Sequence, residues 1–297
     1  MSREVEAGVD MAAWRQSKSF VLDLDMTSML VSATRCIMRA PLTPALSTKT
    51  GAASLGLLVS LLDIAASEPA LAACRPDWTA TQDLSLHATE RLSDGPVVVD
   101  AQLVRVGKKT ITVAANVYDG HGADDFALLQ SAIDEGTGPT LAAKGLLTFA
   151  RISGASATGM DGYDPAHWLG KIRRRTFEHP PVGTLETRMG LQVVDAAAGV
   201  LELAPTRYVT NSIGTIFGGA QAALLQLAAE AMRPGLEATD VQIHYLSQVK
   251  VGPARTRGSV SRDAADHSVV TVQMSDAGND NQLLAHATVL LQRPPRA

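Results

Sequence analysis

Aromatic residues and cysteines are scarce in this chain of 297 residues. Phe, Trp and Tyr together make up 4% of the sequence, so any core must be built mostly from aliphatic side chains. The two cysteines, Cys36 and Cys74, are too few for a disulfide framework or a thiolate metal cluster. We expect both to be buried free thiols in a reducing compartment, which predicts a cytoplasmic protein.

Charge is also limited, and its balance is acidic. Charged residues make up 19% of the chain and the formal net charge is −4, which argues against a nucleic-acid partner because such proteins need a basic field. Residues 1–14 lack the apolar core of an export signal. The most apolar stretch, residues 51–66, contains Asp63 and is shorter than the roughly 20 residues that span a bilayer. We therefore expect no membrane partner, and we interpret this stretch as a buried helix.

An internal repeat organises the chain. The segment Asp83-Leu-Ser-Leu-His87 returns as Asp240-Val-Gln-Ile-His244, at an offset of 157 residues (240 − 83). The same offset relates three further features: Gly95-Pro96 to Gly252-Pro253, Arg105 to Arg262, and Asp119 to Asp276. Chance matches would scatter in offset, so the length of about two domains is interpreted as two copies of one unit.

Each copy begins with an Ala- and Leu-rich helix, predicted at residues 51–66 and 218–232. Strand-like runs rich in β-branched residues follow each helix. They are predicted at residues 111–118, 142–151, 268–274 and 283–293. An apolar helix followed by consecutive hairpins indicates an α+β fold, with a long central helix wrapped by an antiparallel β-sheet in each unit.

The predicted boundaries are residues 1–152 for the N-terminal unit, 153–182 for a connecting segment and 183–297 for the C-terminal unit. Residues 124–133 are an insertion in the first unit, and their pattern fits either a short amphipathic helix or a longer hairpin. The connection carries the basic run Lys171-Ile-Arg-Arg-Arg175, which is typical of a solvated face and could also meet a phosphate.

The sequence around the second helix carries a recognisable pattern. Asn211 and the run Phe217-Gly218-Gly219-Ala-Gln221 lead into the helix, and Asp240 and Tyr245-Leu246 follow it. This pattern resembles the hotdog-fold acyl-CoA thioesterases, both the PaaI-type branch and the thioesterase II branch. In the latter, two hotdog units share one chain.

The resemblance implies two tandem hotdog units that form a pseudo-dimer, with a homo-oligomer of such chains. It also implies hydrolysis of an acyl-CoA thioester to free acid and CoA at the interface between the two halves. Coenzyme A is then part of the substrate, and neither a separate cofactor nor a metal is expected.

The glycine pair at the helix start suits a thioester site. Free N–H groups and the helix dipole at Gly218 and Gly219 would stabilise an oxyanion on the thioester carbonyl. Asn211 would position the carbonyl or the attacking water. The alternative is that both glycines only allow close packing between the helix and the sheet.

The carboxylate that the family places about two turns into the helix is missing from its expected position. That position carries over to Gln226, which would orient reactants, and through the repeat to Val59. Asp63 and Glu230 lie one turn later and could supply the missing base. The helix of one hotdog half faces the glycine loop of the other, so Asp63 would face Gly218. Alternatively, Asp63 caps a partner group or reaches solvent.

Asp240 is a second candidate base, because thioesterase II enzymes use an Asp at this strand position. The alternative is an Asp that only orients the strand. His87 and His244 occupy equivalent positions in the two units, and we expect paired, structural histidines at a pseudo-symmetric interface.

A basic hairpin carries Arg105, Lys108 and Lys109, where hotdog proteins often contact the nucleotide end of coenzyme A. A solvated hairpin tip is the alternative. For the whole chain, the alternative function is a non-catalytic acyl-CoA or lipid-binding hotdog protein that has lost the usual carboxylate.

Overall fold

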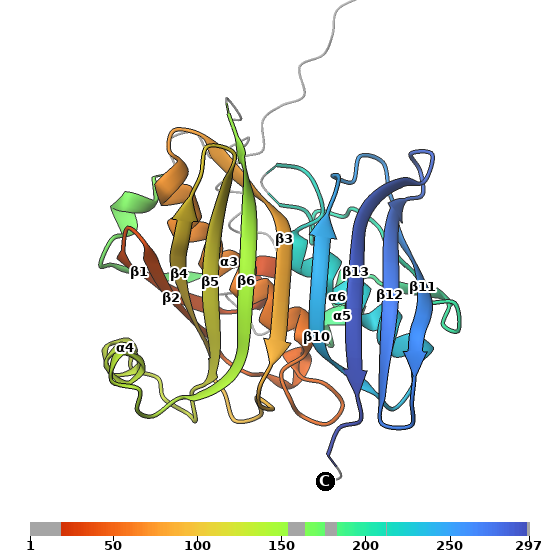
Figure 1. The fold of residues 1–297 in the computed structure, drawn as a ribbon, viewed down its shortest axis with the longest axis horizontal. Helices are drawn as coiled ribbons and strands as arrows, with labels where there is room; N and C mark the ends of the chain where they lie inside the picture. The colour runs from red at the N-terminus through yellow and green to blue at the C-terminus, as the bar shows by residue number, and fades with distance from the viewer. Residues whose placement is uncertain (1–18, 154–163, 176–182, 212, 296–297) are drawn as a thin grey trace, which may run out of the picture.

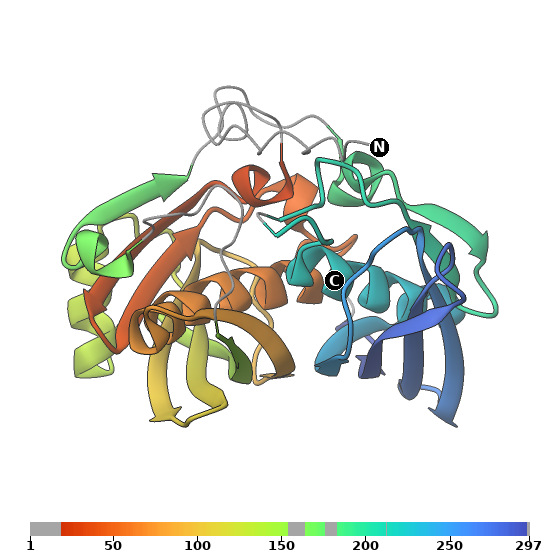
Figure 2. The same ribbon diagram turned by 90° about the horizontal axis from the view of Figure 1, so that it is seen from above.

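The computed structural model describes residues 19–153, 164–175, 183–211 and 213–295. Within these ranges, 13 strands form one antiparallel sheet in the order β7-β1-β2-β4-β5-β6-β3-β10-β13-β12-β11-β9-β8. Two long helices, α3 and α6, lie along one side of it (Figures 1 and 2). The predicted α+β arrangement of two helices, each wrapped by an antiparallel sheet, is confirmed.

Both halves repeat one order of elements: a short helix, two strands, a long helix and four strands. The N-terminal half contains α2 (Phe20–Asp23), β1 (Met26–Ser32), β2 (Arg35–Ala40), η1 (Pro44–Leu46), α3 (Leu55–Cys74), β3 (Trp78–Ala88), β4 (Val97–Val106), β5 (Thr110–Asp119), α4 (Phe126–Glu135) and β6 (Thr140–Ile152). The connection contributes η2 (Pro165–Trp168) and β7 (Ile172–Arg175). The C-terminal half contains α5 (Leu185–Met189), β8 (Gln192–Asp195), β9 (Val200–Leu203), α6 (Gly218–Met232), β10 (Glu237–Tyr245), β11 (Ala254–Asp263), β12 (His267–Asp276) and β13 (Gln282–Gln292).

Strands β3 and β10 join the two halves into one sheet. They pair antiparallel, with Asp240 opposite His87 and His244 opposite Asp83. The Nδ1 atom of His87 lies 3.1 Å from Asp240 Oδ1, and that of His244 lies 2.5 Å from Asp83 Oδ1. The predicted pairing of structural histidines at a pseudo-symmetric interface is therefore confirmed.

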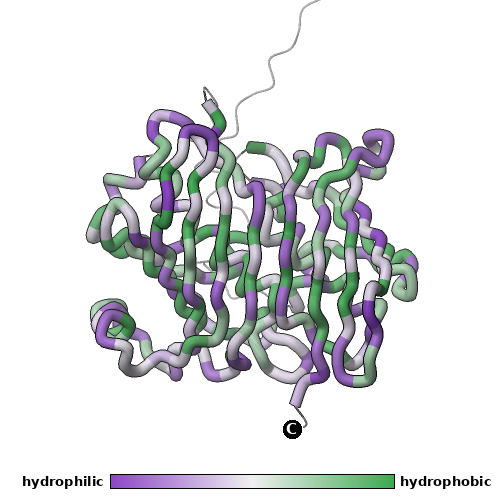
Figure 3. Tube along the Cα trace, viewed as in Figure 1, coloured by the Kyte–Doolittle hydropathy of each residue, from purple (hydrophilic) through white to green (hydrophobic). Residues whose placement is uncertain are grey.

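The helices cross closely on the inner side of the sheet. A Cβ placed on Gly56 of α3 would lie 2.8 Å from the Cα of Ala223 in α6, so only glycine fits there without movement. The sheet wraps this pair of helices, and hydrophilic and hydrophobic positions alternate along its strands (Figure 3). This alternation is expected for a sheet with one face on the core and one facing away from it.

The repeat has a second offset in the loops before the long helices. The bridge between Ser47 and Ala53 matches that between Thr210 and Ile216, an offset of 163 residues (210 − 47). Gly51 and Gly214 are also separated by 163 residues, and their φ values are 83° and 79°. The offset falls to 157 in the strands, and five of these six residues (163 − 157) arise because α3 has 20 residues and α6 has 15.

This register corrects one sequence expectation. Gly51 lies in a turn ahead of the helix, and α3 begins at Leu55 after the N-cap Ser54, so Leu55 is the counterpart of Gly218. The residue that corresponds to Gln226 is therefore Asp63 and not Val59. The position at which the resemblance places a carboxylate therefore holds Asp63 in the first unit, and Asp63 and Glu230 are not equivalent positions.

Two segments for which the sequence leaves alternatives open form regular secondary structure. The insertion forms helix α4, whose first N–H groups are capped by the side chain of Asp125. The basic run forms β7, which pairs with β1 at the edge of the sheet. Arg173 and Arg175 bind the buried Glu68 of α3, so the run is not simply a solvated face.

Helix α3 is long and apolar enough to cross a membrane by length and composition alone, and within the described residues it is the only helix that is. Its most apolar window is 83% buried inside the protein. Burial of this kind is typical of a core helix.

The contact between the helices predicts a stability effect. Gly56→Ala should force α3 and α6 apart and lower the free energy of unfolding by about 1–3 kcal/mol, the usual cost of overpacking. Chemical denaturation measures it, with Leu128→Ala on the exposed face of α4 as the control within about 0.5 kcal/mol. Equal stability of Gly56→Ala and the native chain would contradict the close contact.

Candidate functional site

The start of α6 lies against the middle of α3. Gly218 and Gly219 form the first turn of α6, where N–H groups have no acceptor within the helix. A Cβ on Gly218 would lie 3.0 Å from Oδ2 of Asp63. Because Asp63 belongs to α3, the carboxylate of one half faces the helix start of the other half.

Asp63 is a buried carboxyl group, with 6% of the residue exposed. The hydroxyl of Thr81 on β3 donates to its Oδ1 at 2.5 Å. Burial raises the pKa of Asp63 from 3.8 to about 6, and the hydrogen bond from Thr81 opposes the rise. The carboxyl group therefore changes its charge close to neutral pH.

Tyr245 completes this half-site at the end of β10. Its hydroxyl donates to the carbonyl oxygen of Gly218 at 3.0 Å. Burial, and after it the charge of Asp63, raise the pKa of Tyr245 well above its usual value, so the phenol stays protonated. The sequence pattern contained Tyr245, but neither it nor Thr81 was predicted as a site residue.

Gly219 has a packing role. A Cβ there would lie 2.2 Å from Oγ of Ser60 on α3 and 2.8 Å from Cε1 of Phe217. Of the two roles predicted for this pair, close packing applies to Gly219, which permits the contact between the helices. Gly218 borders Asp63 and stays the candidate for binding the thioester carbonyl.

Gln226 and Glu230 lie at the second, pseudo-symmetric half-site. Oε1 of Gln226 accepts from the N–H of Gly56 at 2.6 Å, and its Nε2 donates to Oε1 of Glu230 at 2.9 Å. Glu230 also accepts from the N–H of Ala238 at 3.0 Å. Burial raises the pKa of Glu230, while the bonds from Ala238 and Gln226 oppose the rise. The structure therefore groups Asp63 with Gly218 and Gly219, and it places Gln226 at the start of α3, with Glu230 bound to Gln226 and to β10.

The second half-site lacks the polar groups of the first. Under the strand offset of 157, Ala238 stands where the first half-site has Thr81 (238 − 81) and Ala88 where it has Tyr245 (245 − 88). An amide, Gln226, replaces the carboxylate, and its own oxygen already occupies the N–H of Gly56. This half-site has no equivalent of the Asp63, Thr81 and Tyr245 set.

Asn211 shapes the loop that leads into α6. Its Oδ1 accepts from the N–H groups of Ile213 at 3.1 Å and Thr215 at 3.3 Å. These bonds close a turn of the type that Asn side chains favour. The structure thus gives the side-chain oxygen a local partner, and direct contact of Asn211 with a substrate stays a prediction.

Asp240 lies on the outer face of the sheet. Val241 and Ile243 are buried on the inner face, so Asp240 points the other way, toward His87 of the neighbouring strand. The candidate base of the thioesterase II pattern is therefore directed away from Gly218.

The three basic residues lie at the tip of the β4–β5 hairpin, where Arg105, Lys108 and Lys109 are exposed. The pairing of Val106 with Ile111, Ile111 with Phe149, and Phe149 with Thr81 places this tip at the same end of the sheet as Thr81. In the C-terminal half, Ala265 and Asp266 stand where the first half has Lys108 and Lys109 (265 − 108). The tip of the β4–β5 hairpin is thus more basic than its counterpart in the C-terminal half.

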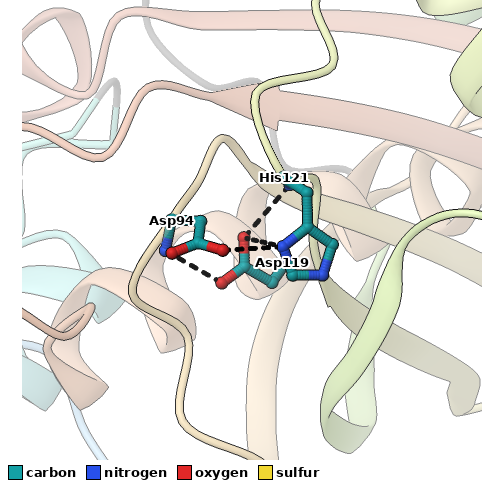
Figure 4. A group of neighbouring side chains, drawn as sticks. All are labelled: Asp94, Asp119 and His121. Atoms are coloured by element: carbon teal, nitrogen blue, oxygen red, sulfur yellow. Dashed lines mark hydrogen bonds and ion pairs between the residues drawn. The ribbon is translucent and has the colours of Figure 1, made fainter.

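Asp94, Asp119 and His121 form a cluster that has the composition of a metal site (Figure 4). The carboxylate of Asp119 accepts from four backbone N–H groups, those of Ser93, Asp94, Gly95 and His121. In the second half, Asp276 accepts in the same way from Lys250, Val251 and Gly252, where Asp94 is replaced by Val251. We conclude that this Asp holds a turn in both halves.

Solved structures with the same architecture are known. A tesB protein of Mycobacterium avium subspecies paratuberculosis is 12% identical, has a TM-score of 0.56, and the match covers 90% of this chain and 96% of that one. A 12:0-ACP thioesterase from Umbellularia californica is 8% identical, with a TM-score of 0.55 and coverage of 88% and 94%. An acyl-ACP thioesterase from Bacteroides thetaiotaomicron is 11% identical, with a TM-score of 0.50 and coverage of 87% and 98%. The fold is thus that of two tandem hotdog units in one chain.

Each half of the chain also matches a family of known sequences. The family described as the thioesterase superfamily matches residues 50–125, and the family described as the acyl-CoA thioesterase N-terminal domain matches residues 207–292. No curated protein sequence matches the chain. The chain therefore belongs to the hotdog thioesterases and is an enzyme of the thioester hydrolase type, with one family match in each half.

The burial of Asp63 predicts a stability gain on its removal. Because the pKa of Asp63 is higher in the folded state, its contribution favours folding below about pH 4 and is lost as pH rises through about 6. Asp63→Asn should therefore raise the free energy of unfolding by about 2–3 kcal/mol at pH 8 and by little at pH 4. Denaturation at both pH values tests this.

The control for this measurement is Glu90→Gln, because Glu90 is exposed and its replacement should change the stability little at either pH. A loss of stability in Asp63→Asn at pH 8 would show that the carboxylate is stabilised by more than Thr81.

Proposed function

We propose that this enzyme hydrolyses acyl-CoA thioesters to free acid and CoA at the half-site formed by Asp63 and Gly218. One observation carries the proposal: a buried carboxyl group of one half faces the first turn of the long helix of the other half. The membership in the thioesterase superfamily supports the reaction type.

The helix start would bind the carbonyl end of the thioester. Its first N–H groups and the positive end of the helix dipole stabilise the negative charge that develops on the carbonyl oxygen when water attacks. Tyr245 holds the peptide of Gly218 through its carbonyl oxygen, so that the N–H groups of this turn keep their direction. Tyr245 is thus a positioning residue.

Asp63 would act as the general base. Its ionised form takes a proton from water as the water oxygen forms a bond to the carbonyl carbon. The C–S bond then breaks, and the proton passes from Asp63 to the departing thiolate to give the acid and free CoA. A pKa of about 6 leaves this group ionised at pH 7 while keeping it basic enough to accept the proton.

The basic hairpin would bind the phosphates of coenzyme A. Arg105, Lys108 and Lys109 are exposed at the end of the sheet that holds Asp63, and the matching hairpin of the other half carries Asp266 in place of Lys109. Electrostatic attraction to phosphate therefore favours substrate entry at one end only.

The alternative of a non-catalytic binding protein rested on a lost carboxylate. Asp63 occupies the position equivalent to Gln226, so the observation behind that alternative no longer holds for the first half.

We also propose that the chains associate further as homo-oligomers, as the resemblance implies. We propose that the enzyme acts in the cytoplasm, because its buried free thiols suit a reducing compartment.

The role of Asp63 predicts a pH profile. Initial rates with acyl-CoA and a thiol reagent should give kcat/KM values that rise with pH around an apparent pKa of about 6. Asp63→Asn should lower kcat by roughly 10²–10⁴-fold. Thr81→Val removes the hydrogen bond that favours the ionised form, so it should move the midpoint to higher pH.

Asp240→Asn and Glu230→Gln are the matched controls, because both remove a carboxylate outside the first half-site. If either abolished turnover while Asp63→Asn did not, the assignment of the base would be wrong.

The hairpin predicts an effect on substrate binding. Replacing both Lys108 and Lys109 by Glu should raise KM roughly tenfold and leave kcat nearly unchanged, because two phosphate contacts are lost. The difference should shrink at high salt. Lys144→Glu on the outer face of β6 is the control, and an equal rise of KM in that variant would point to a general field effect.

A further inference from the structure

An aromatic cluster borders the proposed site. Phe217 precedes Gly218, and its Cε1 lies 2.8 Å from the position of a Cβ on Gly219. The ring of Phe20 from helix α2 packs on it with the centroids 5.6 Å apart. Tyr208 meets Phe20 edge to face at 6.4 Å. Three rings thus lie beside the helix start that would bind the thioester carbonyl.

Polar contacts hold this cluster in place. The N–H of Phe20 donates to the carbonyl oxygen of Tyr208 at 2.8 Å. The hydroxyl of Tyr208 donates to Oδ2 of the buried Asp23 at 2.5 Å, and Arg188 binds the same oxygen. The Arg188 guanidinium also lies over the Tyr208 ring, 5.5 Å from its centroid. Phe20 is 1% exposed and packs between the half-buried rings of Tyr208 and Phe217, so it cannot swing outward without breaking these contacts.

The second half-site shows what the same position looks like without the rings. Under the offset of 163, Ala45 corresponds to Tyr208 (208 − 45) and Ser54 to Phe217 (217 − 54). A small cavity beside Gln226 is lined by both of these small residues. Large rings therefore stand at the first half-site where small side chains border a cavity at the second.

We propose that Phe20, Tyr208 and Phe217 close the acyl end of the first half-site and restrict it to short acyl chains. The proposal rests on the proposed function for the location of the thioester. With the carbonyl oxygen on the Gly218 turn and its carbon toward Asp63, a chain that continues along the turn meets the ring of Phe217.

The energetics favour a sharp upper limit on the length of the acyl chain. A chain too long for a rigid pocket must displace packed rings, and each methylene in or out of such a pocket changes specificity by about 10–200-fold. Because the polar network holds Tyr208 and Phe20, and Phe20 packs on Phe217, displacement of Phe217 costs more than a rotation of one side chain. Long acyl chains are thus excluded by shape.

The test replaces Phe217 by the residue that stands at the equivalent position of the second half-site. Phe217→Ser introduces the residue that the second half-site has at this position, and Phe20→Ala removes the supporting ring from outside the helix start. Acyl-CoA thioesters with chains from acetyl to palmitoyl are compared by kcat/KM, and their non-hydrolysable thioether analogues are compared by calorimetry. Phe126→Ala, which removes a buried ring from the separate cluster around α4, is the control.

The native enzyme should favour the short chains, and both variants should raise kcat/KM and affinity for the medium and long chains by about tenfold or more relative to the short ones. The Phe126→Ala profile should match the native one. Preference of the native enzyme for palmitoyl, or an unchanged profile in both folded variants, would overturn the proposal. Binding without turnover would contradict the hydrolytic function, while the dependence of affinity on chain length would still decide the role of the rings.

Discussion

The close crossing of α3 and α6 is the contact on which the candidate site depends. Gly56 against Ala223 and Gly219 against Ser60 let the two helix axes approach more closely than residues with larger side chains would permit. This approach puts the first turn of α6 beside Asp63 and the first turn of α3 beside Gln226. The sheet contributes by pairing β3 with β10, which brings Thr81 and Tyr245 to the same crossing. The site is therefore a product of packing between halves, and neither half holds it alone.

Much of the fold could be predicted from the sequence, because its signals are local and periodic. The helix at residues 218–232 and the strands near 111–118, 142–151, 268–274 and 283–293 match α6, β5, β6, β12 and β13. The start of α3 was predicted four residues too early, since Gly51 resembles the glycine of a helix start but adopts a positive φ in the preceding turn. Only the hydrogen bonds of the loop fix that register. For this reason the sequence indicates Asp63 as a candidate base but does not show that it is the counterpart of Gln226.

Other parts of the site depend on irregularities that alternation cannot foresee. A bulge between Thr81 and Asp83 turns Thr81 toward Asp63 while Asp83 faces outward, although strict alternation would place both on one face. The bulge between Ala238 and Asp240 is its counterpart in the other half. Asp240 could be read in sequence as a possible base, and only the observed register shows it beside His87. Tyr245 keeps the parity of Val241 and Ile243, so its inward direction could have been inferred.

The covalent connection between the halves has a consequence for how the two half-sites can change. In a dimer of identical single units, one substitution alters both sites at once, and a residue that harms catalysis harms every copy. Here each half-site draws on different codons, so Gln226 could replace a carboxylate beside Gly56 without touching the carboxylate at Asp63. The fusion thus frees one half-site from the demands of chemistry, and its residues can be selected for packing alone.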